Sequence, residues 1–126
     1  MKAARYYDRG DIRIEDVPEP AVEPGTVGID VAYCGICGTD LHEYLDGPIF
    51  IPPAGHPHPI SGECAPITMG HEMSGVVYAV GEGVTDLEPG DPVVVEPYII
   101  RDDVDTSAAN DAYHLSPDMN FIGLAG

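Results

Sequence analysis

Basic residues are scarce in this sequence of 126 residues, which has five Lys and Arg against 22 Asp and Glu and a formal net charge of −17. No Lys or Arg occurs between Arg13 and Arg101. A surface of this charge repels nucleic acid and anionic membranes, so we expect neither as a partner. Because the acidic residues are scattered, we interpret them as a solvated surface suited to high salt and predict a halophilic source. An acidic interaction surface is the alternative.

Long apolar runs are also missing. No stretch approaches the ~20 apolar residues that cross a bilayer, and no basic-then-apolar leader begins the chain. We therefore expect a cytoplasmic protein without membrane contact. There are three cysteines, and an odd number argues against the disulfide framework of a small secreted protein. The length favours one domain.

Proline and glycine, by contrast, are frequent, with 13 and 15 residues respectively, which disfavours long helices. Strands are predicted at residues 2–7 and 11–17 on either side of a turn at Arg9-Gly10, and runs of alternating or β-branched residues predict strands at 27–33, 74–80 and 92–97. A short helix is expected at 39–45, with Thr39 or Asp40 as its N-cap, and residues 47–66 read as a long irregular loop. The pattern predicts a mainly β fold, a partly open barrel with short helices.

Two segments concentrate chemically active side chains. Residues 34–42 read CGICGTDLH, and residues 70–84 read GHEMSGVVYAVGEGV, followed by PGDPVVVEP at 89–97. In this combination and order they resemble the zinc-containing medium-chain alcohol dehydrogenases, whose N-terminal catalytic domain is a GroES-like barrel. The loop HEYLDGPIFIPP and the run APITMGHE are most similar to the 2,3-butanediol dehydrogenase branch. The resemblance covers essentially the whole chain.

This resemblance implies a site around one catalytic zinc ion. Cys37 matches the thiolate ligand and His71 the imidazole ligand, and Glu72 matches a glutamate that binds the metal or its water. Thr39 matches the hydroxyl that takes the substrate proton, and His42 the residue that passes it to solvent. Asp40 matches the carboxylate that orients the ligand histidine.

Other candidate residues receive plainer interpretations. We interpret Cys34 as a buried structural residue at a strand end and Cys64 as a thiol without a role in the site. We expect His56 and His58 to be solvated in their proline-rich loop. Tyr44 could line the substrate pocket or pack the short helix, and the sequence leaves both open.

The sequence also departs from this family. A structural zinc ion would need four cysteines, at positions occupied here by Asp102, Asp105, Ala108 and Ser116, so we predict no structural zinc. Aspartates there, with His114, could hold a harder cation. The run VGEGV at 80–84 resembles a phosphate-binding turn, but it ends a predicted strand and leads into no amphipathic helix, so we interpret it as a turn.

The resemblance therefore implies a GroES-like domain over residues 1–126 that is incomplete at its C-terminal end, where residues 123–126 would be the stub of an unfinished strand, and that lacks the Rossmann domain. It would be the N-terminal zinc-binding catalytic domain of an NAD(P)-dependent alcohol or diol dehydrogenase, inactive alone. NAD(P) would bind only with a second domain, which a complementary Rossmann-domain chain could supply. The alternatives are a non-catalytic zinc-binding remnant and an interaction module that pairs through an open strand edge.

Overall fold

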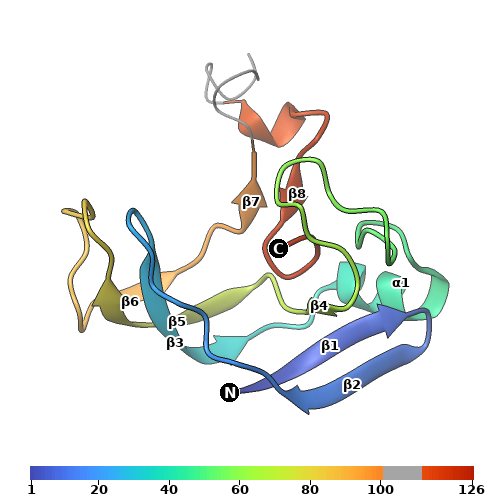
Figure 1. Ribbon diagram of the computed structural model, residues 1–126, viewed down its shortest axis with the longest axis horizontal. Helices are drawn as coiled ribbons and strands as arrows, with labels where there is room; N and C mark the ends of the chain where they lie inside the picture. The colour runs from blue at the N-terminus through green and yellow to red at the C-terminus, as the bar shows by residue number, and fades with distance from the viewer. Residues whose placement is uncertain (101–111) are drawn as a thin grey trace.

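The computed structural model describes residues 1–100 and 112–126. This part of the chain forms two three-stranded antiparallel sheets and a two-stranded ribbon (Figure 1). The first sheet has the order β2-β1-β4, the second β3-β5-β6, and the ribbon β7-β8. The strands are β1 (Lys2–Asp8), β2 (Asp11–Asp16), β3 (Val27–Cys34), β4 (Ile67–Thr68), β5 (Met73–Val80), β6 (Pro92–Val94), β7 (Tyr98–Ile99) and β8 (Asn120–Phe121). They are joined by helix α1 (Gly38–Asp46) and the 3₁₀ turn η2 (Tyr113–Leu115).

The mainly β prediction is confirmed, and the five predicted strands are present. The last of them is shorter than predicted, since β6 ends at Val94 and the chain leaves the sheet before Pro97. The β1–β2 hairpin turns at Gly10, whose positive φ of 72° favours glycine. The expected irregular loop at 47–66 contains neither helix nor strand, and residues 81–84 form a turn as predicted.

Strand β3 departs from the simple alternation that its sequence suggests. Its pairing with β5 shifts register twice, between Gly28 and Ile29 and between Val31 and Tyr33. The apolar face therefore does not stay buried along the whole strand, and the side chain of Tyr33 is 80% exposed. The strand was correctly predicted, and its second half is exposed.

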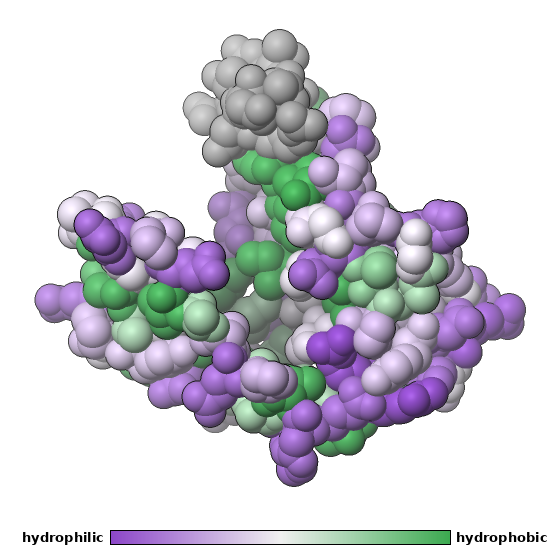
Figure 2. Space-filling model, viewed as in Figure 1, coloured by the Kyte–Doolittle hydropathy of each residue, from purple (hydrophilic) through white to green (hydrophobic). Residues whose placement is uncertain are grey.

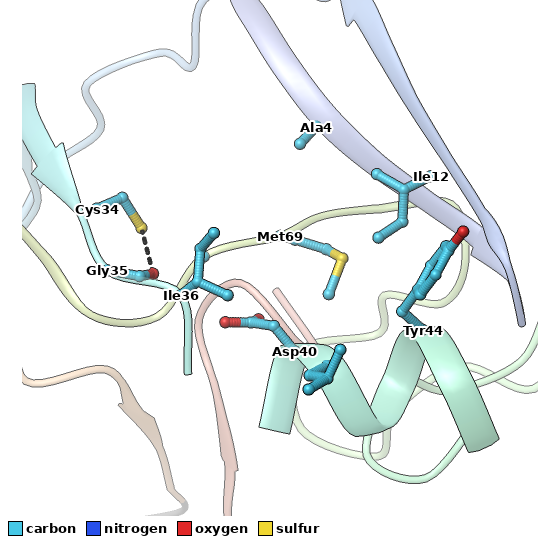
Figure 3. A pocket seen from close by; sticks show the side chains of 10 residues that line it. Ala4, Ile12, Cys34, Gly35, Ile36, Asp40, Tyr44 and Met69 are labelled. Atoms are coloured by element: carbon cyan, nitrogen blue, oxygen red, sulfur yellow. Dashed lines mark hydrogen bonds between the residues drawn. The ribbon is translucent and has the colours of Figure 1, made fainter. Parts of the chain in front are cut away.

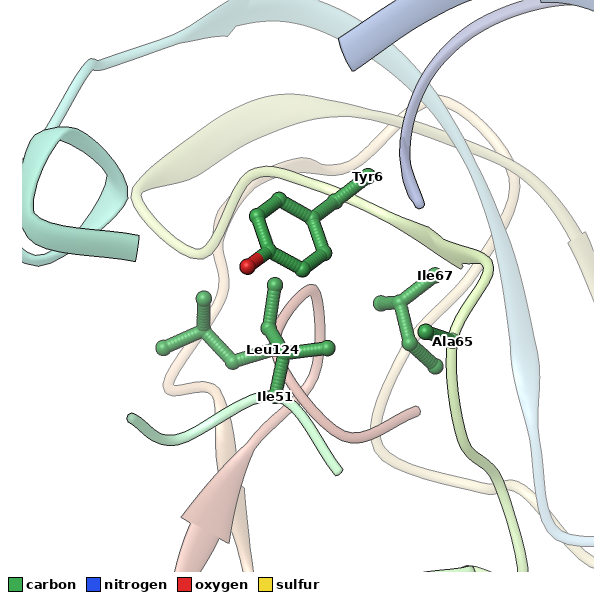
Figure 4. Close-up of a cluster of buried hydrophobic side chains, with 5 residues drawn as sticks. All are labelled: Tyr6, Ile51, Ala65, Ile67 and Leu124. Carbon is green, nitrogen blue, oxygen red and sulfur yellow. The ribbon is translucent and has the colours of Figure 1, made fainter. Parts of the chain in front are cut away.

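The hydrophobic core gathers side chains from distant parts of the sequence (Figure 4). Its buried members are Tyr6, Ile51, Ala65, Ile67 and Leu124. The long loop thus contributes directly to the core, and each fully buried aliphatic side chain there stabilises the fold by about 1.5–3 kcal/mol.

The C-terminal residues form a turn rather than the start of a further strand, which corrects the sequence-based expectation. After β8 the chain reverses, with Ala125 N–H donating to Phe121 O at 2.8 Å and Gly123 at a φ of +89°. Leu124 and Ala125 are completely buried. The apolar pattern of these residues therefore reflects packing into the core. Within the described ranges, no helix is long and apolar enough to cross a membrane.

Candidate metal centre

Helix α1 begins at the first of the predicted ligands. Cys37 is the N-cap, with the extended φ and ψ of −79° and 157° that precede a helix. Asp40 reaches back over the first turn, and its Oδ2 accepts the Cys37 N–H at 2.8 Å. The predicted N-cap of Thr39 or Asp40 was therefore wrong, because the carboxylate of Asp40 caps the helix from within its first turn.

Three predicted metal ligands meet in the fold. Cys37, His71 and Glu72 each offer one ligand atom, and these atoms lie within 4.8 Å of one another. The meeting follows from strand pairing, because β3 and β5 bring Cys34 opposite Met73. One residue beyond this pair, Gly35 N–H donates to Glu72 O at 2.8 Å. Glu72 is itself part of this contact, His71 precedes it by one residue, and Cys37 follows Gly35 by two residues.

Gly35 is needed where these two segments touch. A Cβ atom placed on Gly35 would lie 2.7 Å from Oε2 of Glu72 and 3.3 Å from its Cβ. Glycine therefore lets the Glu72 side chain lie close over the backbone that leads to Cys37. Glu72 itself is exposed, while Cys37 is half-buried and His71 is buried.

The ring of His71 is held from two directions. Its Nδ1 lies 3.4 Å from Oδ1 of Asp40, and in the described part of the chain neither of these buried atoms has a hydrogen-bond partner. Phe121 stacks on the ring at a centroid distance of 5.7 Å and an interplanar angle of 29°. With Nδ1 turned toward the carboxylate, Nε2 is the nitrogen left for a metal ion. Asp40 thus lies where the sequence-based interpretation requires it.

A hollow of about 670 Å³ opens in front of these residues. Cys37, Thr39, His71 and Glu72 line one part of it, and the Oγ1 of Thr39 lies 3.6 Å from the Sγ of Cys37. Much of the remaining lining is apolar, including Val94, Tyr98 and Phe121. Figure 2 shows this hollow between the β5–β6 side and the β7–β8 ribbon, with hydrophobic colouring along it.

His42 lies on the outer side of the site. It follows Thr39 by one turn of α1, its side chain is 68% exposed, and its Nδ1 lies 3.7 Å from Oδ2 of Asp46. It does not line the hollow. The structure therefore places Thr39 beside Cys37 and Asp40 beside His71. His42 lies on the solvent-exposed surface of helix α1.

A second hollow, of about 390 Å³, has a different set of lining residues (Figure 3). Cys34 and Tyr44 line it, so Tyr44 does not face the hollow of the metal ligands. Cys34 is exposed, which makes the prediction of a buried residue wrong. β3 ends at Cys34, and the two thiols line different hollows as free cysteines.

The loop histidines differ from each other. His56 is exposed as expected, but His58 is only 9% exposed, so its predicted solvation was wrong. The Nδ1 of His58 accepts the N–H groups of Ile60 and Ser61, each at 3.4 Å, which fixes the ring within the loop. Cys64 is half-buried and lies outside the metal-ligand group.

The structure describes only part of the segment that is expected to lack structural zinc. Asp102, Asp105 and Ala108 lie outside the described residues, so the absence of that zinc stays a prediction. Ser116 is buried, and its N–H donates to Tyr113 O at 3.0 Å, while His114 is exposed.

Residues 23–126 match the alcohol dehydrogenase GroES-like domain. The chain belongs to this family. It is 76% identical over 126 residues to an (R,R)-butanediol dehydrogenase of Neisseria gonorrhoeae, a match that covers all of this chain and 35% of the relative. A crystal structure of 2R,3R-butanediol dehydrogenase from Bacillus subtilis superposes with a TM-score of 0.89 at 56% identity, covering 99% of this chain and 34% of that one.

A sorbitol dehydrogenase of Gallus gallus is 38% identical over 94% of this chain and 31% of its own length. The chain therefore spans about a third of the length of these relatives. The resemblance inferred from the two motifs is confirmed, and so is the GroES-like, mainly β fold.

Proposed function

We propose that this chain is the N-terminal zinc-binding catalytic domain of an NAD(P)-dependent alcohol or diol dehydrogenase similar to (R,R)-butanediol dehydrogenases. One observation carries the proposal: a thiol, an imidazole and a carboxylate converge within 4.8 Å beside a hollow that also holds a threonine hydroxyl. The proposed substrates of the complete enzyme are small secondary alcohols or vicinal diols.

The donor set fits zinc. Thiolate, imidazole and carboxylate are all good zinc ligands, and three protein ligands with one open position are typical of a catalytic site. The contact of Asp40 with the far side of His71 supports this fit, because ligand histidines commonly direct their second nitrogen to a carboxylate. We therefore assign Cys37, His71 and Glu72 as the residues that would hold one Zn²⁺ ion.

When bound, zinc supplies a Lewis acid that makes the hydroxyl group of an alcohol easier to deprotonate. The hydroxyl of Thr39 would accept this proton, since it lines the same hollow as the ligands. His42 would release the proton to water from its exposed position one turn later. The apolar walls at Val94 and Phe121 would hold the carbon skeleton and exclude water.

Hydride transfer needs a nicotinamide, for which the sequence offers no glycine-rich phosphate-binding turn before a helix. We propose that NAD(P) is bound by a second, Rossmann-type domain or by a complementary chain that carries one. The 126-residue chain alone is then expected to bind zinc but to show no NAD(P)-dependent oxidation of 2,3-butanediol. Measurable turnover by the isolated chain would contradict this part of the proposal.

Metal analysis of purified chains tests the ligand assignment. After exposure to zinc and dialysis, the wild type should retain about one zinc ion per chain, as expected for one catalytic site. Cys37→Ser should lose most of it, because a serine hydroxyl is a poor zinc ligand. Cys34→Ser is the matched control, since this thiol lies three residues away and outside the ligand group. Equal zinc in wild type and Cys37→Ser would rule out the assignment.

A further inference from the structure

Glu43 is a completely buried carboxylate in the middle of helix α1. Within residues 1–100 and 112–126 it takes part in none of the ion pairs. Burying a carboxylate without a compensating partner is costly, so such a residue is retained only where other groups satisfy it. It lies one turn after Asp40 on the same helix.

The compensation comes from the backbone of the loop that follows the helix. Oε1 of Glu43 accepts the N–H of Ile49 at 3.1 Å, the N–H of Ile51 at 3.2 Å, and the N–H of Phe50 between them. Oε2 also accepts from Ile49, at 3.0 Å. One carboxylate therefore fixes three consecutive peptide groups against α1.

Phe50, at the centre of this triplet, connects the loop to strand β8. Its carbonyl oxygen accepts the Asn120 side-chain N–H at 2.9 Å. Its ring meets the ring of Phe121 edge-on at a centroid distance of 6.5 Å. Phe121 in turn stacks on His71.

Two chains of contacts thus lead from Glu43 to the same imidazole. One runs along α1 to Asp40, which faces Nδ1 of His71. The other runs through Phe50 to Phe121, which covers a face of the His71 ring. An imidazole held at its edge and on its face has a fixed plane, which a metal ligand requires.

We propose that Glu43 is a positioning residue for the metal centre, which sets the orientation of the His71 ring through the loop at Phe50 and the stacked Phe121. The inference rests on the proposed function for its purpose, but the positioning itself is a property of the metal-free chain. A purely local role, in which Glu43 only secures its loop, would leave the His71 ring where it is.

The first readout needs no metal. The ring current of the stacked Phe121 shifts the NMR signals of the His71 ring protons, so these signals report the stacking directly. Glu43→Ala should move them toward the positions of an unstacked histidine. Glu43→Gln should stay close to the wild type, because its amide oxygen can occupy the Oε1 position that receives all three N–H groups. Glu63→Ala is the control, since Glu63 is exposed.

The second readout is the binding of Co²⁺ as a spectroscopic substitute for zinc. Glu43→Ala should raise the dissociation constant by less than the about 10- to 100-fold expected for loss of a direct partner of a metal ligand such as Asp40, and should change the visible Co²⁺ spectrum. Glu43→Gln should largely restore both. Phe50→Leu keeps the backbone hydrogen bonds but removes the ring contact with Phe121, and should cause a smaller change in the same direction.

A folded Glu43→Ala chain with unchanged His71 signals and unchanged Co²⁺ affinity would overturn the inference. If Glu43→Ala does not fold, Phe50→Leu becomes the test of the positioning role. Unchanged His71 signals in Phe50→Leu would then overturn the inference. A wild-type chain that binds no Co²⁺ would refute the proposed function, while the His71 signals would still test the positioning role.

Discussion

Replacing Tyr6 by phenylalanine should stabilise the protein, and more so as the pH rises. The Tyr6 side chain is almost completely buried in the core, yet its hydroxyl has no hydrogen-bond partner among residues 1–100 and 112–126. Phenylalanine keeps the ring among Ile51, Ile67 and Leu124 and removes only the unpaired group. An unsatisfied buried polar group costs about 1–3 kcal/mol, so Tyr6→Phe should raise the free energy of unfolding at neutral pH by about 1 kcal/mol.

The pH dependence follows from ionisation of the phenol. Burial, with smaller contributions from the charges of Glu43 and Asp8, raises the pKa of Tyr6 from 10.0 to about 12. Below pH 10 the group is protonated in both folded and unfolded chains, and its contribution to stability is fully present. Between pH 10 and pH 12 only the unfolded chain loses the proton, so stability falls with rising pH. At about 1.4 kcal/mol per pKa unit, the wild type loses about 2–3 kcal/mol over this range.

Urea unfolding from neutral pH to about pH 11.5 measures this effect as the difference in free energy of unfolding between Tyr6→Phe and the wild type. The difference cancels the titration of other tyrosines, and it should widen above pH 10. Tyr33→Phe serves as the control because Tyr33 is 80% exposed, and it should leave the free energy of unfolding nearly unchanged. A Tyr6→Phe difference that stays constant or shrinks as the pH rises would refute the reasoning.

Three further predictions concern the backbone, the metal site and the charge. Gly123→Ala should lower the free energy of unfolding, measured in urea, by more than about 2 kcal/mol, because the φ of Gly123 is +89° and a Cβ atom there would clash with Gly70 O. Gly83 has the same φ but open space around it, so Gly83→Ala should lower the free energy of unfolding by only about 1 kcal/mol. Asp40→Ala should weaken zinc binding about 10- to 100-fold in a chelator competition, and unchanged binding would contradict its role at His71. Raising KCl should increase stability in urea unfolding by screening the net charge of −17, and full stability at low salt would contradict a halophilic origin.

The strands were predictable from alternating apolar residues and from the turns beside them. The turn at Arg9-Gly10 marks β1 and β2, and alternation marks β5; the observed bounds of all three lie within about one residue of the prediction. The helix was also predicted, but its start was misplaced because the capping group belongs to Asp40, which reaches back to Cys37 from three residues later. Local pattern identifies the element, whereas the side chain that caps it depends on geometry.

Burial was less predictable because it depends on segments far apart in the sequence. Cys34 is exposed at the end of β3, and His58 is buried in the long loop, where its Nδ1 accepts two backbone N–H groups. Glu43 looked like an ordinary acidic residue of a short helix, yet it lies completely buried against the next loop. Its spacing of three residues from Asp40 was the one available signal of a shared helix face.

The candidate site was recognisable from its two sequence motifs. Neither motif by itself predicts that the two segments lie side by side in the fold. The pairing of β3 with β5 brings Cys37 to His71 and Glu72 across more than thirty residues of sequence. The contribution of Phe121, which stacks on His71, comes from a third segment that carries no motif. A packing partner of this kind can be identified only from the three-dimensional structure.

X-ray absorption spectroscopy of the zinc-loaded chain tests the metal assignment most directly, because it counts the sulfur atoms bound to the metal. With Cys37, His71 and Glu72 as ligands, the spectrum should show one sulfur at about 2.3 Å and nitrogen or oxygen neighbours at about 2.0–2.2 Å. Cys37→Ser should abolish the sulfur contribution. Two sulfur atoms would require a second thiol ligand, Cys34 or Cys64, and no sulfur would exclude Cys37; either result would contradict the proposed site.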